Sequence, residues 1–328
     1  MKNLGGLASR FLSLTAVLII ISGCGTVKVP INLTHPAEIN MSQYTQIAIS
    51  DIKGNMGQSF SEGLKNRLIE SNRFKVVDRN RMNLIMKELK LSQSDLSDSG
   101  NAIKLGKLMS ASALIAGHTE GCYKEKTSSS KGTCYKNKKK YSCTIYYRKG
   151  QYSTSGSIDV IDVQTGQIIK SKILNAAYNK STSATDTTPP PINKDSLAYA
   201  ALSKNLDDFM KAITPWDEMV QVPFVKDNAI PELEKGINQA KIGELEEAIK
   251  IFRSAAKAAE CNAKIKSDSI AKAYWNLGLA FEYSSDYDNA IKAFKKAYCL
   301  NPKDDYSNEI KNAKILRAEK KKLDKQCN

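Results

Sequence analysis

Residues 274–302 read YWNLGLAFEYSSDYDNAIKAFKKAYCLNP, and this stretch decides the fold of the C-terminal half of the chain. Its small and aromatic residues have counterparts 42 positions earlier, since 278 − 236 = 42. The four matching pairs are Gly236 with Gly278, Ala248 with Ala290, Phe252 with Phe294, and Ala255 with Ala297. Small residues let two helices approach closely, and aromatic rings fill the space between them. The stretch therefore predicts an internal repeat of two helical hairpins over residues 229–302.

The second hairpin resembles the tetratricopeptide (TPR) pattern. The residues that carry this resemblance are Tyr274, Leu277, Gly278, Phe281, Ala290, Phe294, Ala297 and Pro302. TPR units ordinarily repeat every 34 residues or so, about 8 fewer than here, and the excess falls near residues 261–267, in the loop between the units. The first unit matches less well, because Gln239 occupies a position where an aromatic residue is usual. The resemblance implies an all-α TPR helical-repeat domain.

The same resemblance implies a groove that binds a segment of a partner protein. Candidate groove residues on the first helix of the second unit are Asn276, Leu279 and Tyr283. The alternative is that the two units, fewer than the usual three, dock on the preceding domain as a structural brace. Residues 303–328 are predicted to form a charged capping helix, and residues 216–228 a linker.

The region over residues 43–215 alternates strand and helix patterns. Residues 113–117, Ala-Leu-Ile-Ala-Gly, predict a buried strand, and residues 46–50 predict a second one. An apolar helix face follows from residues that recur every four positions, which are Met56, Phe60, Leu64 and Leu68. Further elements are expected as a strand over 74–78, helices over 82–89, 102–108 and 197–213, and a hairpin over 157–169. Together these elements predict an α/β domain of layered α+β type.

This region resembles the CsgG-like family, named for the curli secretion channel of the outer membrane. The segments that carry the resemblance are residues 74–79, 84–89, 102–108, 113–117 and 163–168. They cover about half of the chain in the expected order. The resemblance implies a CsgG-like α/β domain over residues 43–215, and relatives with this module include lipoproteins that activate cell-wall synthases.

Residues 121–152 and 178–193 are predicted to be polar loops inserted into that domain. In the secretion channel, two hairpins at these places enter the membrane, where a lysine facing lipid costs about 2–4 kcal/mol. Five lysines of the first insertion share one parity, namely Lys124, Lys126, Lys136, Lys138 and Lys140. The second insertion holds three prolines at 189–191, which cannot join a strand ladder. The sequence therefore favours a member of the family that forms no pore; the alternative is a subunit of an oligomeric curli-type secretion channel.

The N-terminus has the features of an export signal. Lys2 and Arg10 precede an apolar run over residues 11–21, which is too short to span a membrane. Ser22-Gly23-Cys24 then resembles the lipobox of bacterial lipoproteins, which implies a signal peptide over residues 1–23 and a lipid on Cys24. Gly25 follows where Asp tends to retain lipoproteins at the inner membrane, so the resemblance favours the outer membrane. Residues 24–42 are predicted to be a linker.

The remaining cysteines are even in number and are expected in an oxidising compartment. They are Cys122, Cys134, Cys143, Cys261, Cys299 and Cys327. Six cysteines allow 15 connectivities, and the clustering of the first three indicates that at least one bridge is local to residues 121–152. No metal site is expected, because no Cys-x-x-Cys occurs and His35 and His118 are the only histidines.

Composition and missing motifs limit the function. The chain has a formal charge of +15, and loss of Lys2 and Arg10 leaves 15 − 2 = +13. An exported protein does not meet nucleic acid, so a solvated lysine-rich surface or an anionic envelope component is expected to account for this charge. No G-x-S-x-G, Walker loop or H-E-x-x-H is present, and neither an enzyme nor a cofactor is expected. The sequence predicts a lipid-anchored periplasmic adaptor for a cell-envelope or secretion apparatus, with a homo-oligomer left open.

Overall fold

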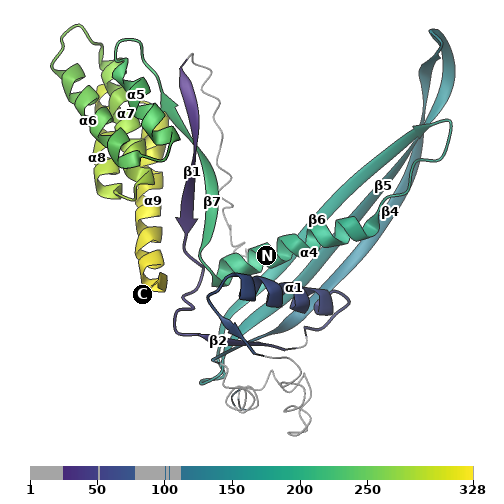
Figure 1. Ribbon diagram of the computed structural model, residues 1–328. Coiled ribbons are helices and arrows are strands. Elements are labelled where there is room, and N and C mark those ends of the chain that lie inside the picture. The colour runs from purple at the N-terminus through teal and green to yellow at the C-terminus, as the bar shows by residue number, and fades with distance from the viewer. Residues whose placement is uncertain (1–24, 51, 78–99, 101–102, 104–111, 328) are drawn as a thin grey trace, which may run out of the picture. The chain divides into compact units, whose positions relative to one another are not determined.

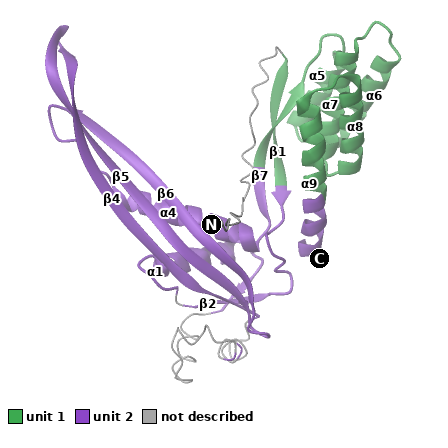
Figure 2. Cartoon of the chain, turned by 180° about the vertical axis from the view of Figure 1, so that it is seen from behind, with its two compact units in different colours: residues 1–33, 219–317 green, residues 34–218, 318–328 purple. Residues whose placement is uncertain are grey.

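The computed structural model describes residues 25–50, 52–77, 100, 103 and 112–327. The chain forms two compact units (Figure 2). Unit 1 contains residues 1–33 and 219–317, and unit 2 contains residues 34–218 and 318–328. The signal peptide over residues 1–23, the lipid site Cys24 and the helices expected over 82–89 and 102–108 lie outside the described residues, except for position 103.

Unit 2 is a mixed α/β domain built on a five-stranded sheet with the order β3-β2-β4-β5-β6. Its strands are β2 (Gln46–Ile49), β3 (Lys75–Val76), β4 (Ala113–Lys136), β5 (Lys139–Asp162) and β6 (Ile168–Thr185). Strand β2 pairs in parallel with β3 and β4, and the strands β4, β5 and β6 are antiparallel. Helices α1 (Gly57–Glu70) and α4 (Lys194–Ile213) pack with this sheet (Figure 1).

The core of unit 2 follows the predicted apolar pattern. Phe60, Leu64 and Leu68 of α1 have no exposed surface. The ring of Phe60 meets that of Phe209 of α4 edge to face, with centroids 6.1 Å apart. The strand predicted over residues 113–117 is the buried centre of the sheet, since Ala113 and Ile115 are fully buried between β2 and β5. A continuous apolar stretch with strands on both sides explains why this prediction succeeded.

The first predicted polar loop was wrong, and the second was wrong over half of its length. Residues 121–152 belong to β4 and β5, which pair without interruption from Ala113 opposite Asp162 to Lys136 opposite Lys139. Asn137 and Lys138 form the turn and both have positive φ, as a two-residue hairpin of this type requires. The first half of the second segment is also strand, because β6 extends to Thr185, while residues 186–193 lie in neither helix nor strand. The distal part of β4 is exposed on both faces and shows no apolar alternation, while β5 alternates only over short stretches such as Tyr141, Cys143 and Ile145, so the sequence pattern marks only part of the hairpin as strand.

Both predicted linkers were also wrong, because they contain strands. Residues 24–42 include β1 (Thr26–His35), and residues 216–228 include β7 (Trp216–Val225). The two strands pair as a two-stranded sheet. Val29, Val222 and Phe224 have no exposed surface and join the core of unit 1. The alternation was obscured by Pro30 and Pro223, which a two-stranded sheet tolerates because each strand has a free edge.

The helices of unit 1 are α5 (Glu232–Lys241), α6 (Leu245–Glu260), α7 (Ser267–Tyr283), α8 (Tyr287–Leu300) and α9 (Asp304–Cys327), whose last residues are assigned to unit 2. A Cβ added at Gly236 would lie 2.4 Å from the ring of Phe252, and one added at Gly278 would lie 2.4 Å from the ring of Phe294. Both glycines therefore serve the close helix contact that the 42-residue repeat predicted. In α9, Tyr306, Ala313 and Leu316 are buried, and the Tyr306 ring lies 5.2 Å from that of Trp275.

Candidate functional site

The predicted groove residues lie on a side of α7 that the chain itself covers. Asn276 has no exposed surface, and its Oδ1 accepts a hydrogen bond from the Val225 N–H at 2.9 Å. Its Nδ2 donates to the Val225 carbonyl at 2.8 Å. The Trp275 Nε1 donates to the Pro223 carbonyl at 3.2 Å. Side chains of α7 thus bind the extended backbone of β7, in the way expected for a peptide from another protein.

The prediction of partner-binding residues was therefore wrong for two of the three. The Asn276 side chain is hydrogen-bonded to Val225 of β7 through both its oxygen and its nitrogen. Leu279 is only 1% exposed and lies in the core of the unit. Tyr283 is half-buried and packs against the same core. The physical reason is that β7, which the sequence indicated as a linker, occupies this side of α7.

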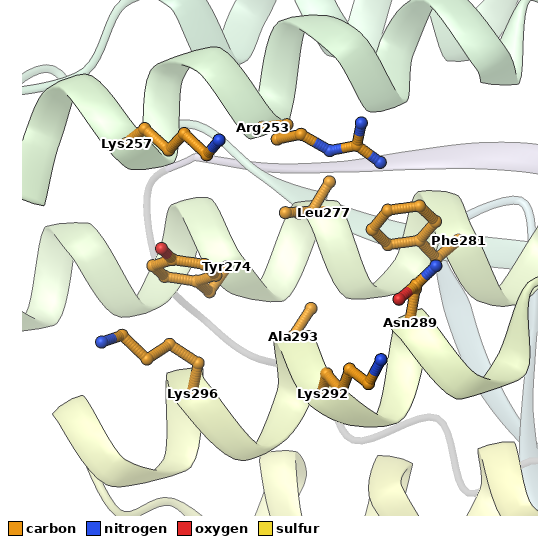
Figure 3. A pocket seen from close by; sticks show the side chains of 9 residues that line it. All are labelled: Arg253, Lys257, Tyr274, Leu277, Phe281, Asn289, Lys292, Ala293 and Lys296. Atoms are coloured by element: carbon orange, nitrogen blue, oxygen red, sulfur yellow. The ribbon is translucent and has the colours of Figure 1, made fainter.

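A groove of about 600 Å³ opens on another side of α7, between α6 and α8 (Figure 3). Helix α6 supplies Arg253 and Lys257, and helix α8 supplies Lys292 and Lys296. The remaining lining residues form the floor of the groove between these two walls, and they are Tyr274, Leu277, Phe281, Asn289 and Ala293. The groove has cationic side chains on both walls and uncharged residues between them.

The cations of the groove differ in their existing partners. Lys296 forms an ion pair with Glu260 at 2.9 Å, and Arg253 stacks over Phe281 with 5.2 Å between the guanidinium carbon and the ring centroid. Within the described part of the chain, Lys257 and Lys292 have neither an ion pair nor a side-chain hydrogen bond. The two lysines are exposed, so their charges are available to an anionic ligand.

Tyr274 and Glu260 close one end of the groove. The Tyr274 hydroxyl donates to Glu260 Oε2 at 2.8 Å. Burial, and then this hydrogen bond, raise the pKa of Tyr274 to about 12. The hydrogen bond from Lys296 lowers the pKa of the Glu260 carboxyl. The tyrosine therefore stays neutral and the carboxylate stays charged at neutral pH, so this end carries one negative charge against the surrounding lysines.

The floor contributes little apolar surface. Leu277, Phe281 and Ala293 are each only 5–6% exposed, because they already pack within the unit. A ligand in the groove would thus gain more from charge and hydrogen bonding with the walls than from burial of the floor. The arrangement is suited to binding carboxylates, and no sequence motif marked it, because its residues come from three helices.

The lysines of the β4–β5 hairpin lie on both of its faces. Residues directly opposite each other share a face, and Lys126 is opposite Lys149, Lys136 opposite Lys139, and Tyr135 opposite Lys140. The turn thus reverses the parity, so that Lys140 lies on the other face from Lys124, Lys126 and Lys136, while Lys138 lies in the turn. The expectation that these five lysines share one face of the hairpin was wrong. Because lysines lie on both faces, neither face is suited to contact lipid.

One disulfide is present among the described cysteines. It joins Cys134 and Cys143 beside the hairpin turn, which confirms that a bridge is local to residues 121–152. Cys122, Cys261, Cys299 and Cys327 are exposed free thiols, so the other pairs considered from the sequence do not form here.

The two histidines lie apart from each other. His35 contacts Glu319 at 3.0 Å and Glu218 at 3.2 Å, and its ring stacks on Trp216. His118 lies 3.5 Å from Glu120. In the portion of the chain that the structure describes, no group of three or more His, Cys, Asp or Glu side chains is placed to hold a metal ion. Among the described helices, none is long and apolar enough to cross a membrane.

Comparison with known proteins places a family match on the N-terminal half. Residues 27–188 match the family model described as curli production assembly/transport component CsgG. No curated protein sequence matches the chain. The match includes β1 and all five strands of the unit 2 sheet.

Several solved structures are distantly similar. The C-terminal domain of LpoB from Escherichia coli has 16% identity and a TM-score of 0.26, covering 40% of this chain and 82% of that one. The lipoprotein GNA1162 from Neisseria meningitidis has 12% identity and a TM-score of 0.25, covering 48% and 94%. A putative neuraminyllactose-binding hemagglutinin homolog from Helicobacter pylori has 9% identity and a TM-score of 0.27, covering 53% and 85%. The family match, which rests on sequence, identifies residues 27–188 as a CsgG-like domain.

Proposed function

We propose that this protein is a lipid-anchored adaptor of the bacterial cell envelope, which holds a partner protein through its helical unit. The single observation that carries the proposal is the open groove between α6 and α8. Its cations Lys257 and Lys292 are exposed and form no ion pair in the described chain, so they are free to bind an anionic ligand. The CsgG-like domain supports an envelope role, since the family is named for curli assembly and transport. The TPR-like pattern of residues 274–302 supports a protein as the ligand.

The lipid anchor is the second part of the proposal. The sequence Ser22-Gly23-Cys24 after a short apolar run supports acylation of the Cys24 thiol. Gly25 supports an outer-membrane destination, with the body of the protein facing the periplasm. A single anchored chain presents its binding unit near the membrane surface and leaves it free to reach a second component.

The anchor is tested by replacing Cys24 with Ser and growing cells with a labelled fatty acid. We expect the label to be lost and the variant to leave the membrane fraction. A variant at an exposed free thiol, Cys299→Ser, is the matched control and should keep both the label and the membrane fraction. Membrane retention of the Cys24→Ser protein would contradict the anchor.

The adaptor role is tested by photo-crosslinking in intact cells. A photoreactive residue at position 289, on the groove, should capture a defined envelope protein, because a bound segment would lie within reach. The same residue at position 295, which is exposed on α8 and does not line the groove, is the control. Equal yields from both positions, or none from either, would contradict an adaptor that works through this groove.

A channel subunit is the second candidate, and the length of the β4–β5 hairpin favours it. Each strand has 24 residues, which exceeds the roughly 9–11 residues that span a bilayer. Lysines on both faces oppose it. Discrete ion conductance from the purified protein in lipid vesicles would favour the channel over the adaptor.

A further inference from the structure

We propose that the groove between α6 and α8 binds a short acidic segment of the partner, with two carboxylates held between the walls. This inference rests on the proposed adaptor function and specifies the chemistry of its ligand. The four wall cations, the volume of about 600 Å³ and the absence of a large exposed apolar floor carry it.

The cations form two facing pairs along the groove. Lys257 faces Lys296 at the end near Tyr274, and Arg253 faces Lys292 at the end near Phe281 (Figure 3). Within each wall the two cations are four residues apart, which corresponds to about 6 Å along a helix. Each facing pair can hold one carboxylate by charge-assisted hydrogen bonds from both sides.

The spacing of the pairs defines the spacing of the acids. In an extended segment, alternate residues point to the same face and lie about 6.6 Å apart. Two acidic residues separated by one residue thus match the two cation pairs. The Asn289 side chain already donates a hydrogen bond to Asp286 at 2.7 Å. The carboxylates of the ligand are therefore bound by the cations and not by Asn289.

The charge balance also favours an acidic ligand. Among the described residues, Glu260 is the one acid that forms an ion pair with a wall cation of the groove, and that cation is Lys296. At the Arg253–Lys292 end, the nearby carboxylate of Asp286 accepts from Asn289 and has no ion pair with either wall cation in the described chain, while a ligand carboxylate at the Lys257–Lys296 end would share Lys296 with Glu260. A cavity of this volume takes a few side chains and does not enclose a nucleic-acid duplex.

The test measures fluorescence anisotropy of labelled peptides with the purified full-length chain in detergent micelles. The probe carries the sequence Ser-Glu-Leu-Glu-Leu-Glu-Ser, and its counterpart has Gln in place of every Glu. We expect saturable binding of the acidic peptide, at least about tenfold tighter than that of the Gln peptide, and weaker binding as salt is raised. Equal binding of the two peptides would overturn the proposal.

The groove is located by matched variants. Lys257→Gln with Lys292→Gln should weaken binding of the acidic peptide about tenfold or more, because each loses a charge-assisted contact. Lys241→Gln with Lys295→Gln removes the same charge from exposed positions outside the groove and should change binding less than about twofold. All four lysines are exposed, and thermal unfolding of the variants should match that of the parent. Equal losses in both double variants would overturn the groove as the site.

The outcomes separate this inference from the adaptor proposal. If crosslinking from position 289 persists in cells with the Lys257→Gln, Lys292→Gln chain, the adaptor stands and the acidic-segment inference falls. If a polyphosphate of equal charge competes fully at stoichiometric concentration, the groove recognises charge alone and the inference of an acidic peptide is wrong.

Discussion

Helix α7 has one side closed by its own chain and another side that is open. On the closed side, Asn276 makes two hydrogen bonds to Val225, and Trp275 makes one to Pro223. On the open side, Lys257 and Lys292 of the neighbouring helices form neither an ion pair nor a side-chain hydrogen bond within the described chain. The polar groups of one side are satisfied within the molecule, while the charges of the other side are left for a ligand.

This difference indicates that residues on the closed side of α7 stabilise the fold, while residues on the open side are available to bind a ligand. A buried amide must find its partners inside the fold, since an unsatisfied one costs about 1–3 kcal/mol. An exposed lysine meets water instead and contributes little to stability. Substitutions on the closed side should therefore change folding, and substitutions on the open side should change binding.

The largest expected effect comes from opening the closed side. Asn276→Ala should lower the free energy of unfolding by about 2–3 kcal/mol, because the Val225 N–H and carbonyl lose their partners. Urea unfolding of the full chain, followed by far-UV circular dichroism, measures this. Lys292→Ala on the open side is the control and should stay within about 0.5 kcal/mol. Equal losses of stability from the two substitutions would contradict the distinction between the closed and open sides of α7.

A smaller effect is expected where α7 meets α8. Gly278→Ala should cost about 1–2 kcal/mol, since the new methyl would lie 2.4 Å from the Phe294 ring and force it to shift. Gly236→Ala meets Phe252 at the same distance in the first hairpin and should cost a similar amount. Thermal unfolding of both variants measures this. If Gly236→Ala were harmless while Gly278→Ala was not, the two hairpins would not be equivalent.

A further variant should stabilise the unit in a pH-dependent way. Glu282 of α7 is buried beside Glu309, and in the described residues its Oε2 has no hydrogen-bond partner. Burial, and then the charge of Glu309, raise the pKa of the Glu282 carboxyl well above its usual value. Since its folded pKa is raised, the contribution of Glu282 to stability is greatest below about pH 4.5 and is lost as the pH rises through the folded pKa.

Glu282→Gln should therefore raise the free energy of unfolding at pH 7 by about 1 kcal/mol, because the amide has no charge to desolvate. Unfolding curves at pH 4 and pH 7 measure the effect, and we expect the gain to shrink toward pH 4. A gain of the same size at both pH values would mean that the charge is not its cause.

The smallest effect on global stability is expected at the hairpin tip. Cys134→Ser with Cys143→Ser should change global unfolding by less than about 0.5 kcal/mol, because the tip is largely exposed on both faces and can open locally. Hydrogen exchange should instead increase over residues 130–146. Cys122→Ser, at an exposed free thiol of the same strand, should leave exchange in the tip unchanged. A large loss of global stability would show that the tip is coupled to the core.

Several local features were predictable from the sequence because neighbours along the chain determine them. The buried strand over residues 113–117 is a continuous apolar run. The Gly–Phe pairs of the two helical hairpins lie 16 positions apart within each unit, since 252 − 236 = 16 and 294 − 278 = 16. The Cys134–Cys143 bridge joins residues nine positions apart across a two-residue turn.

The candidate site could not be predicted in the same way. Its wall cations come from two helices, and lysine on an exposed helix face is ordinary, so no spacing marks Lys257 and Lys292 as partners in one groove. The place of Asn276 in the repeat predicts a partner-binding residue, but its side chain binds the backbone of β7 in the same chain. The sequence pattern does not distinguish a backbone segment of the same chain from one of a partner protein.

The sequence by itself determined the order of an α/β domain and a helical repeat, through short-range apolar periods that each element needs in order to bury one face. Only the tertiary structure decided which side of α7 is available to a partner. Asn276 and Val225 are 51 positions apart, and Thr34 of β1 reaches Asp217 of β7 across 183 positions. The pairings involve the strands β1 and β7, whose apolar alternation is interrupted by Pro30 and Pro223. Their hydrogen bonds form only when the whole chain brings these distant segments together.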